Sequence, residues 1–403
     1  MTKPRTIVVV GTMGTHPYAG MAWMHMQITG GLRRLGHNVY YMEVTSTWPY
    51  DPIRRRKVRD SNYTLSYVAR VAAEFGLSDR WAYRRSYLDN EWFGLGRRRA
   101  KELLRDADAV FNVSGATLLR TREDLDVGNL IYLGTDPVIC EIGFHNGDDI
   151  WKKVVEQHDL FATYGENIGK PQCSIPPLPL LKARTRQPVL LDLWEAGDPQ
   201  RAEFTTVCNW RQDGLDLDFH GEIYRWSKHS EFLKVIDLPL LTSQPIELAM
   251  GLNPGDPGRG EAVRAIGMTT QERCLLDTNG WHLADAHAFT ADVWPYRDYI
   301  KASRGEFTVA KDQNVRLRSG WFSERSACYL AAGRPVVTQD TGFGDVLPTG
   351  EGLFAFKTTE EAAAALEAIN SDYPHHSRAA RAIAEEYFRA ETVLEKLMND
   401  LGL

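Results

Sequence analysis

The sequence predicts an α/β protein made of two Rossmann-like domains that follow one another along the chain and face a common cleft. Three observations support this fold class. The chain has 403 residues, about twice the length of a typical single domain. Short apolar runs that suit buried strands alternate with helical patterns in both halves. Five prolines between residues 176 and 199 separate the two halves, as is typical of an interdomain connection.

The first domain opens with a β-α-β unit. Residues Thr6–Gly11 (TIVVVG) form an apolar run that ends in glycine and suits a strand buried on both faces of a parallel sheet. A helix follows and ends at Gly36; its core-facing residues recur at intervals of four, four and three, at Met24, Ile28, Leu32 and Leu35. Asn38–Val44 is the next strand, so we expect a right-handed crossover between the two strands.

The same alternation continues to the end of the chain. In the first half we expect helices over residues 65–75, 97–107 and 148–158, and strands over 109–114, 129–133 and 160–164. In the second half we expect strands over 204–210, 246–250, 306–310, 335–339 and 353–356, and helices over 259–266, 296–303 and 322–332. From Thr358 the chain is helical, and its last helix is long enough to cross back to the first domain. The predicted parts are a first domain at 1–185, a linker at 186–203, a second domain at 204–385 and a C-terminal helix at 386–403.

Composition limits the classes of function. The formal charge of −6 and the pI of about 6.0 provide no overall positive field for nucleic acid or for an anionic membrane. No apolar stretch approaches the roughly 18 residues of a membrane span, and no leader precedes the first strand. The five cysteines form no zinc-like cluster. We therefore expect reduced thiols, no bound metal and a cytoplasmic protein; the oligomeric state stays open.

Two basic runs interrupt this acidic balance, at Arg54–Lys57 and at Arg97–Lys101. Acidic residues follow both runs closely, which is typical of a solvated surface. The alternative is a patch that contacts the acceptor or a membrane surface.

The most informative segment is Arg318–Gly344. Ser323 suits a helix N-cap, so free backbone N–H groups, a hydroxyl and a guanidinium meet at one helix start, a combination that suits a diphosphate. Gly320 precedes this helix and permits close approach of a ligand. Because ligands of open parallel sheets bind beyond the carboxyl ends of strands, the loop after the next strand should join the site. The predicted donor-binding residues here are Gly320, Ser323, Arg325, Ser326, Asp340, Thr341 and Gly342; the alternative is that Ser323 only caps and Arg325 is a solvated surface residue.

The segment LAAGRPVVTQDTGFGDVLPTGEGLFAF, with its A-x-G-x-P-V-V turn and strand, resembles the donor-binding region of GT-B glycosyltransferases, in particular the CgeB-like and family-four-like bacterial branch. The opening loop GTMGTHPYAG is similar to the acceptor-side loop of that family. This resemblance implies a nucleotide-sugar co-substrate, UDP- or TDP-linked, and no further cofactor. Where retaining members carry two glutamates eight positions apart, this chain has Gly320 and Cys328, so a retaining mechanism is not supported.

Further donor-side candidates follow other predicted strands. Asn209 and Arg211 come after the first strand of the second domain, and Lys311 follows the strand at 306–310 in the same way. Arg211 suits phosphate binding, with an ordinary surface role as the alternative. We also expect Trp281 and His282 to bracket the base, although a tryptophan is more often a core aromatic.

On the acceptor side, His16 lies in the loop after the first strand, where an inverting enzyme of this fold needs a base to deprotonate an acceptor hydroxyl. His25, on the next helix, competes for this role and is otherwise an acceptor-binding residue or a buried histidine. Asp136 and Glu166 follow later strands and complete the predicted catalytic set. Gly14 and Asn167 are the remaining predicted acceptor-binding residues.

These features predict metal-independent transfer of a sugar from a nucleoside diphosphate to a small-molecule or glycan acceptor, since the chain has no D-x-D motif and the helix start replaces a cation. Three alternatives remain open at this point. A nucleotide-sugar epimerase or hydrolase would use the same donor site. A noncatalytic binding subunit would keep only the fold. A dinucleotide-dependent oxidoreductase is disfavoured, because the first loop reads G-T-M-G-T-H instead of G-x-G-x-x-G.

Overall fold

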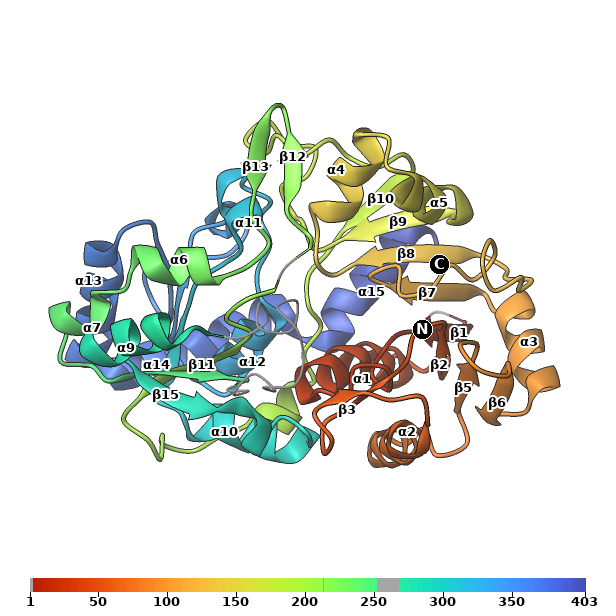
Figure 1. Cartoon of the computed structure of the whole chain (residues 1–403), viewed down its shortest axis with the longest axis horizontal. Coiled ribbons are helices and arrows are strands. Elements are labelled where there is room, and N and C mark those ends of the chain that lie inside the picture. Colours follow the sequence, from red (N-terminus) through yellow and green to blue (C-terminus); the bar gives the residue numbers. More distant parts are fainter. Residues whose placement is uncertain (1–2, 213, 252–267) are drawn as a thin grey trace.

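The computed structural model describes residues 3–212, 214–251 and 268–403 and confirms two α/β halves, each built on its own mainly parallel sheet (Figure 1). The helix predicted over 259–266 lies outside the described residues. No helix in the described ranges is long and apolar enough to cross a bilayer.

The first sheet has eight strands, and β1 lies inside it with parallel neighbours on both sides. In spatial order the strands are β10 (Leu181–Arg184), β9 (Leu160–Thr163), β8 (Leu130–Gly134), β7 (Ala109–Val113), β1 (Thr6–Val10), β2 (Asn38–Thr45), β5 (Trp81–Arg85) and β6 (Glu91–Gly94). Only β5 and β6 pair antiparallel. Strands β5, β6 and β10 were not predicted, because these strands at and beside the edges of the sheet mix charged and apolar residues and carry no continuous apolar run.

The second sheet has six strands, all parallel to their neighbours. Their spatial order is β15 (His282–Asp285), β14 (Ile246–Met250), β11 (Phe204–Cys208), β16 (Gly305–Thr308), β17 (Val336–Gln339) and β18 (Leu353–Phe356). Two short hairpins stand outside the sheets, β3 (Tyr50–Asp51) with β4 (Arg56–Lys57) and β12 (Leu217–Phe219) with β13 (Glu222–Tyr224).

Helices cover the sheets as the predicted alternation requires. The first half contains α1 (Ala19–Arg34), α2 (Asn62–Glu74), α3 (Arg97–Asp106), α4 (Ile139–His145), α5 (Asp149–Gln157) and the short η1 (Leu191–Trp194). The second half contains α6 (His229–Lys234), α7 (Leu238–Leu241), α9 (Thr270–Thr278), η2 (Ala286–Ala288), α10 (Val293–Ala302), α11 (Asp312–Arg316), α12 (Glu324–Ala331), η3 (Phe343–Asp345), α13 (Thr359–Ser371), α14 (Tyr373–Ile383) and the π-turn η4 (Ala384–Phe388).

The last helix, α15 (Ala390–Leu401), crosses back to the first half as predicted and packs on α1 (Figure 1). The crossing begins where Val189 exchanges backbone hydrogen bonds with Phe388 and Ala390, at 2.7 and 3.0 Å. Gly31 of α1 provides the close approach, since a Cβ there would lie 2.4 Å from Leu394. One hydrophobic cluster contains residues of α1, α10, α12 and α14, so the two halves share part of their core.

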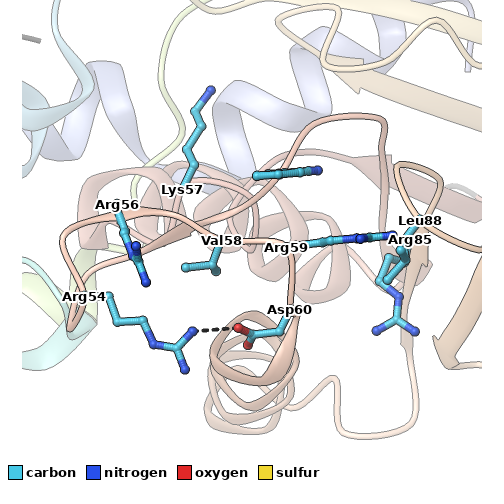
Figure 2. A pocket seen from close by; sticks show the side chains of 9 residues that line it. Arg54, Arg56, Lys57, Val58, Arg59, Asp60, Arg85 and Leu88 are labelled. Atoms are coloured by element: carbon cyan, nitrogen blue, oxygen red, sulfur yellow. Dashed lines mark hydrogen bonds and ion pairs between the residues drawn. The ribbon is translucent and has the colours of Figure 1, made fainter. Parts of the chain in front are cut away.

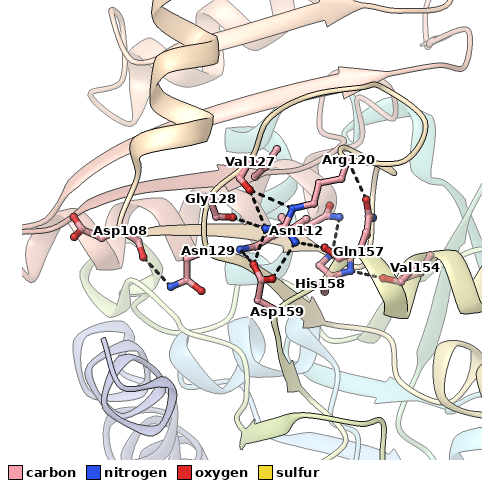
Figure 3. Close-up of polar contacts among 11 residues, drawn as sticks. Asp108, Asn112, Arg120, Val127, Gly128, Asn129, Val154, Gln157, His158 and Asp159 are labelled. Atoms are coloured by element: carbon pink, nitrogen blue, oxygen red, sulfur yellow. Dashed lines mark hydrogen bonds and ion pairs between the residues drawn. The ribbon is translucent and has the colours of Figure 1, made fainter.

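A polar network fixes the long connection between β7 and β8 (Figure 3). The Arg120 guanidinium donates to the carbonyls of Val127, Gly128 and Gln157 at 2.6–3.2 Å and pairs with Asp159 at 2.7 Å. One side chain therefore ties this loop to the start of β9. The network thus stabilises the first sheet and does not occupy the carboxyl ends of its strands.

Gly31→Val should lower the free energy of unfolding by about 1–3 kcal/mol, because the added carbons overpack the contact between α1 and α15. Chemical denaturation monitored by circular dichroism measures this change. Gly20→Ala is the matched control on the same helix: its new Cβ would meet nothing closer than 3.5 Å, so the variant should be at least as stable as the wild type. Equal stability of Gly31→Val and the wild type would contradict the packing of α15.

Candidate functional site

The loops that follow the strands of the two sheets meet one another. Asp136 and Asn167 follow β8 and β9 of the first sheet, and Lys311 and Gly342 follow β16 and β17 of the second. Lys311 pairs with Asp136, and the Asn167 amide donates to the Gly342 carbonyl at 2.9 Å. The carboxyl edges of the two sheets therefore form one composite site, as the sequence predicted for the cleft.

Lys311 bridges the two halves. Only 7% of its surface is exposed, its ammonium lies 2.9 Å from the ring centroid of Trp226, and burial lowers its pKa although Asp136 opposes this shift. The other Asp136 oxygen is buried and has no hydrogen-bond partner in the described part of the chain. The pair thus places a desolvated cation and an incompletely satisfied carboxylate at the same point between the halves.

Lys228, which the sequence analysis missed, is the second cation at this edge. Burial, and after it the nearby Arg325 guanidinium, lowers the pKa of Lys228 to about 7. Across the described residues, no carboxylate lies within ion-pair distance of its ammonium, whereas Lys311 has Asp136 and Arg325 has Glu306. A desolvated lysine without a counterion is unfavourable on its own and is stabilised by an anion. Its place before α6 carries no motif, so only the fold reveals it.

The start of α12 departs from its predicted role in one respect. Ser323 is the N-cap residue and makes no side-chain capping bond, and the Ser326 hydroxyl is buried with no partner among the described residues. Arg325 instead turns inward: its guanidinium donates to Glu306 at 2.6 Å, to the Val207 carbonyl at 2.6 Å and to Thr308. The predicted contact of Arg325 with the diphosphate is therefore not supported by this structure, because the hydrogen bonds of its guanidinium are made inside the second domain.

Asn167 occupies the space that the sequence analysis assigned to a ligand near Gly320 and Gly342. Both glycines have positive φ, and a Cβ on either would lie 2.8 Å from Asn167. Asn167 is fully buried, and its backbone N–H donates to the Ser319 carbonyl at 3.0 Å. Gly320 and Gly342 thus permit close approach, as predicted, but the group that approaches is a side chain of the other half.

The loop after β17 is held by internal bonds. Asp340 accepts from the Gly342 N–H at 2.7 Å and pairs with Arg318 at 3.3 Å, while the Thr341 hydroxyl donates to the Trp321 carbonyl at 2.5 Å. A polar cavity of about 270 Å³ opens beside this loop, lined by Arg318, Asp340, Gly344, Asp345, Thr349, Ala355, Lys357 and Glu361.

The acceptor-side loop after β1 is organised by Glu43, a second residue that the sequence analysis missed. The Glu43 carboxylate accepts from the backbone N–H groups of Gly14 and Thr15, at 2.8 and 2.6 Å, and from the hydroxyls of Thr15 and Tyr41. Burial raises the pKa of Glu43 to about 7, although these hydrogen bonds oppose the shift. Gly14, predicted to bind the acceptor, therefore uses its amide to hold the loop that carries His16.

The two histidines of this region differ in access. Burial and then the charge of Lys57 lower the pKa of His16, so its imidazole is neutral near pH 7. His25 is 1% exposed, contacts the Met21 carbonyl through Nδ1 at 2.6 Å, and has its pKa lowered to about 4 by burial. His25 is thus a buried core residue, and its predicted acceptor-binding role is wrong for this structure. His16 remains the candidate base.

Three comparisons with known proteins bear on this geometry. No family model and no curated protein sequence matches the chain. Among solved structures, the Anabaena protein HepE in complex with UDP-glucose is similar over 99% of both chains, with 12% identity and a TM-score of 0.59. An α-glucosyltransferase in complex with UDP and DNA covers both chains fully, with 9% identity and a TM-score of 0.58. Sucrose-phosphate synthase from Thermosynechococcus elongatus matches 98% of this chain and 99% of its own, with 11% identity and a TM-score of 0.50.

The chain has the GT-B fold. In this fold the remaining predicted residues divide between the cleft and other places. Asn209 is exposed at the carboxyl end of β11, at the predicted edge. Arg211 follows it but pairs with Glu272 at 2.6 Å, so its charge is already compensated.

Three further predictions fail for reasons that the GT-B fold makes plain. Trp281 is 3% exposed and donates its indole N–H to the Ile236 carbonyl at 2.7 Å, as a core aromatic does. His282 is the first residue of β15, which puts it at the amino end of the strand, away from the edge that Lys311 occupies. Glu166 pairs at 2.7 Å with Arg186, which stacks on Tyr387. This carboxylate therefore helps to position the C-terminal segment.

The structure therefore pairs the predicted Asp136 with Lys311 and adds Lys228 near Lys311 and Arg325, while His16 stays in the loop that Glu43 holds. Within the described residues, no group of three or more His, Cys, Asp or Glu side chains could hold a metal ion. The absence of a metal requirement stays a prediction.

Glu43→Gln should flatten the pH dependence of stability. The folded pKa of about 7 lies above the ordinary 4.5, so the stability that protonated Glu43 contributes is present below about pH 4.5 and is lost as the pH rises through 7. Between pH 4.5 and 8 the wild type should lose on the order of 3 kcal/mol relative to Glu43→Gln. Urea unfolding across this pH range measures the difference. Glu395→Gln, at an exposed position, should keep the wild-type slope; the same slope in Glu43→Gln would contradict the assignment.

Proposed function

We propose that this chain is a glycosyltransferase that transfers a hexose from UDP-glucose or a similar UDP-sugar to an acceptor hydroxyl, without a divalent metal. The observation that carries the proposal is Lys228, a half-buried lysine with no ion-pair partner among the described residues, near Lys311 and Arg325 of α12. A diphosphate supplies the negative charge that this group of cations lacks. Ser326, whose buried hydroxyl has no partner among the described residues, offers a further hydrogen bond.

The comparisons support the choice of donor. HepE, which has the same fold, is in complex with UDP or UDP-glucose, and the α-glucosyltransferase is in complex with UDP. Because identity to these proteins is only 9–12%, the shared fold supports the donor class and the residues that bind it are argued from this chain alone. TDP remains the second choice of nucleotide. The CgeB-like branch and the cytoplasmic location stay predictions from the sequence, as does the acceptor class beyond its being a hydroxyl compound.

The reaction follows from the charges at the edge. The acceptor oxygen attacks the anomeric carbon, the bond from that carbon to the β-phosphate oxygen breaks, and UDP leaves with the electron pair. Lys228 and Lys311 stabilise the charge that develops on the departing phosphate, which is the role of a divalent cation in metal-dependent enzymes. These cations are held by the fold, so they need no metal to be in place before the reaction.

The acceptor proton passes to His16. Its pKa is lowered by burial and by Lys57, so the imidazole is available as a base near neutral pH. Asp136 pairs with Lys311 in this structure; when a diphosphate takes over Lys311, the carboxylate is released to orient the acceptor hydroxyl or the imidazole.

UDP-glucose should raise the melting temperature of the wild type in the presence of EDTA, and Lys228→Met should weaken this binding about 10- to 100-fold because a charge-assisted contact to phosphate is lost. Binding must also weaken as the pH rises above 7, since Lys228 takes up a proton when the anion binds. Thermal shift titrations at pH 6.5 and 8.5 measure both effects. In Lys228→Met the pH dependence should disappear.

Lys234→Met is the matched control, because Lys234 is exposed and its charge is already paired with Glu231 at 2.6 Å. It should bind UDP-glucose like the wild type. Lys228→Met removes a half-buried cation that has no ion-pair partner among the described residues, so its unfolding free energy should not fall. If UDP-glucose stabilises neither protein, or if NAD alone stabilises the wild type, the glycosyltransferase proposal is wrong. Release of glucose from UDP-glucose at the full turnover rate without any acceptor would instead identify a hydrolase.

A further inference from the structure

A strongly basic cavity of about 620 Å³ lies beside the β3–β4 hairpin (Figure 2). Its lining contains five cationic residues, Arg54, Arg56, Lys57, Arg59 and Arg85, against one carboxylate, Asp60. The indole of Trp48, 49% exposed, forms an aromatic part of the wall. The whole protein carries a net charge of −6, so this local excess of positive charge is not a consequence of composition.

Three of the five cations are without an ion-pair partner in the described part of the chain. Arg54 pairs with Asp60 at 2.6 Å, the contact drawn in Figure 2, and Arg85 pairs with residues outside the cavity. No carboxylate of the described residues lies within ion-pair distance of Arg56, Lys57 or Arg59. Arg54 and Asp60 cancel one another, so the uncompensated charge of the cavity lies on those three residues.

The hairpin that carries these residues is built to hold its shape. Asp51 is 4% exposed, and one of its oxygens accepts from the backbone N–H groups of Ile53 and Arg54 at 2.9 and 3.0 Å. This closes the turn, in which Arg55 adopts a positive φ of 51°. Behind the turn, the Val58 N–H donates to the Pro49 carbonyl at 2.9 Å. These bonds fix the backbone that carries the neighbouring cations.

The cavity adjoins the acceptor side of the proposed active site. The Tyr50 N–H donates at 3.0 Å to the carbonyl of Thr15, the residue before His16, and the rings of Tyr50 and Tyr18 lie 5.3 Å apart. Lys57 is near enough to lower the pKa of His16. The hairpin also reaches the second half, where Arg55 pairs with Asp285 at the end of β15 at 3.5 Å. The hairpin that lines the cavity is therefore attached to the loop that carries the candidate base.

We propose that the acceptor of this transferase carries a phosphate, and that Arg56 and Arg59 bind that phosphate while the hydroxyl to be glycosylated faces His16. The inference rests on the proposed function, since it assigns the acceptor of that reaction. Planar guanidinium groups bind phosphate oxygens in pairs, and a cavity of this volume accommodates a sugar phosphate. Trp48 offers the flat apolar face on which a sugar ring stacks.

Binding of glucose 6-phosphate and of glucose, measured by isothermal titration calorimetry, tests this assignment. Glucose 6-phosphate should bind the wild type, and the double variant Arg56→Ala, Arg59→Ala should bind it at least tenfold more weakly. Glucose should bind both proteins much more weakly than the phosphate ester. The double variant Arg97→Ala, Arg98→Ala removes the same charge from the exposed start of α3 and should bind glucose 6-phosphate like the wild type.

A phosphate borne by a lipid would present the same chemistry to the cavity, and Ile53, 81% exposed at the hairpin turn, lies where a bilayer surface would meet it. Flotation with vesicles of phosphatidylcholine, with and without one third phosphatidylglycerol, distinguishes this source. Binding to the anionic vesicles alone, lost in the Arg56 and Arg59 double variant, assigns the phosphate to a lipid headgroup. Binding of glucose 6-phosphate, lost in the same variant, assigns it to a soluble acceptor.

The inference fails if neither probe binds, or if both double variants bind the probes equally. UDP-glucose binding by the Arg56 and Arg59 double variant separates this failure from failure of the donor site. Intact UDP-glucose binding together with unbound phosphate probes overturns the acceptor assignment alone, whereas loss of UDP-glucose binding in the wild type overturns the proposed function itself.

Discussion

The cost of keeping positive charge away from water at the carboxyl edge of the second sheet governs the arrangement of the cleft. An ion pair with the fully buried Glu306 offsets this cost for Arg325. An ion pair with Asp136 of the other half offsets it for Lys311. Lys228 has neither kind of partner among the described residues, and its lowered pKa expresses the remaining penalty. The three cations thus differ in how fully a carboxylate neutralises them, and a bound anion would stabilise this edge.

That electrostatic arrangement depends on how firmly the halves are held together. Asp136 compensates Lys311 only because β8 and β16 end opposite one another, and Asn167 fixes this register by filling the space between Gly320 and Gly342. The return of the chain through Val189 and α15 adds a second connection, on the side of α1. The pair of Lys311 with Asp136 also joins the two halves. A ligand that releases Lys311 therefore also removes a contact that holds the halves together.

Local pattern was enough to predict the buried strands and the return of the last helix, because a strand covered on both faces is apolar throughout and α15 has a continuous apolar stripe. It also predicted that Lys311, Asp136 and the start of α12 converge, since parallel strands end at one edge. It could not show that Arg325 turns inward, because this depends on Glu306, Val207 and Thr308 from two other strands. His282 was placed at the wrong edge for a similar reason: β15 was not predicted, so nothing marked that residue as the beginning of a strand.

The acceptor side shows why a basic run that is followed by acids need not be ordinary solvated surface. The acids beside Arg54–Lys57 compensate only part of the charge, since Asp51 and Asp60 both pair with Arg54 and Asp51 also closes the turn. The position of the hairpin is set by its hydrogen bond to Thr15. Glu43, on β2, in turn holds Thr15 by accepting from its backbone N–H. One buried carboxylate thus positions both the loop of His16 and the hairpin of Lys57. The backbone position from which Lys57 acts on the candidate base is therefore set by the fold.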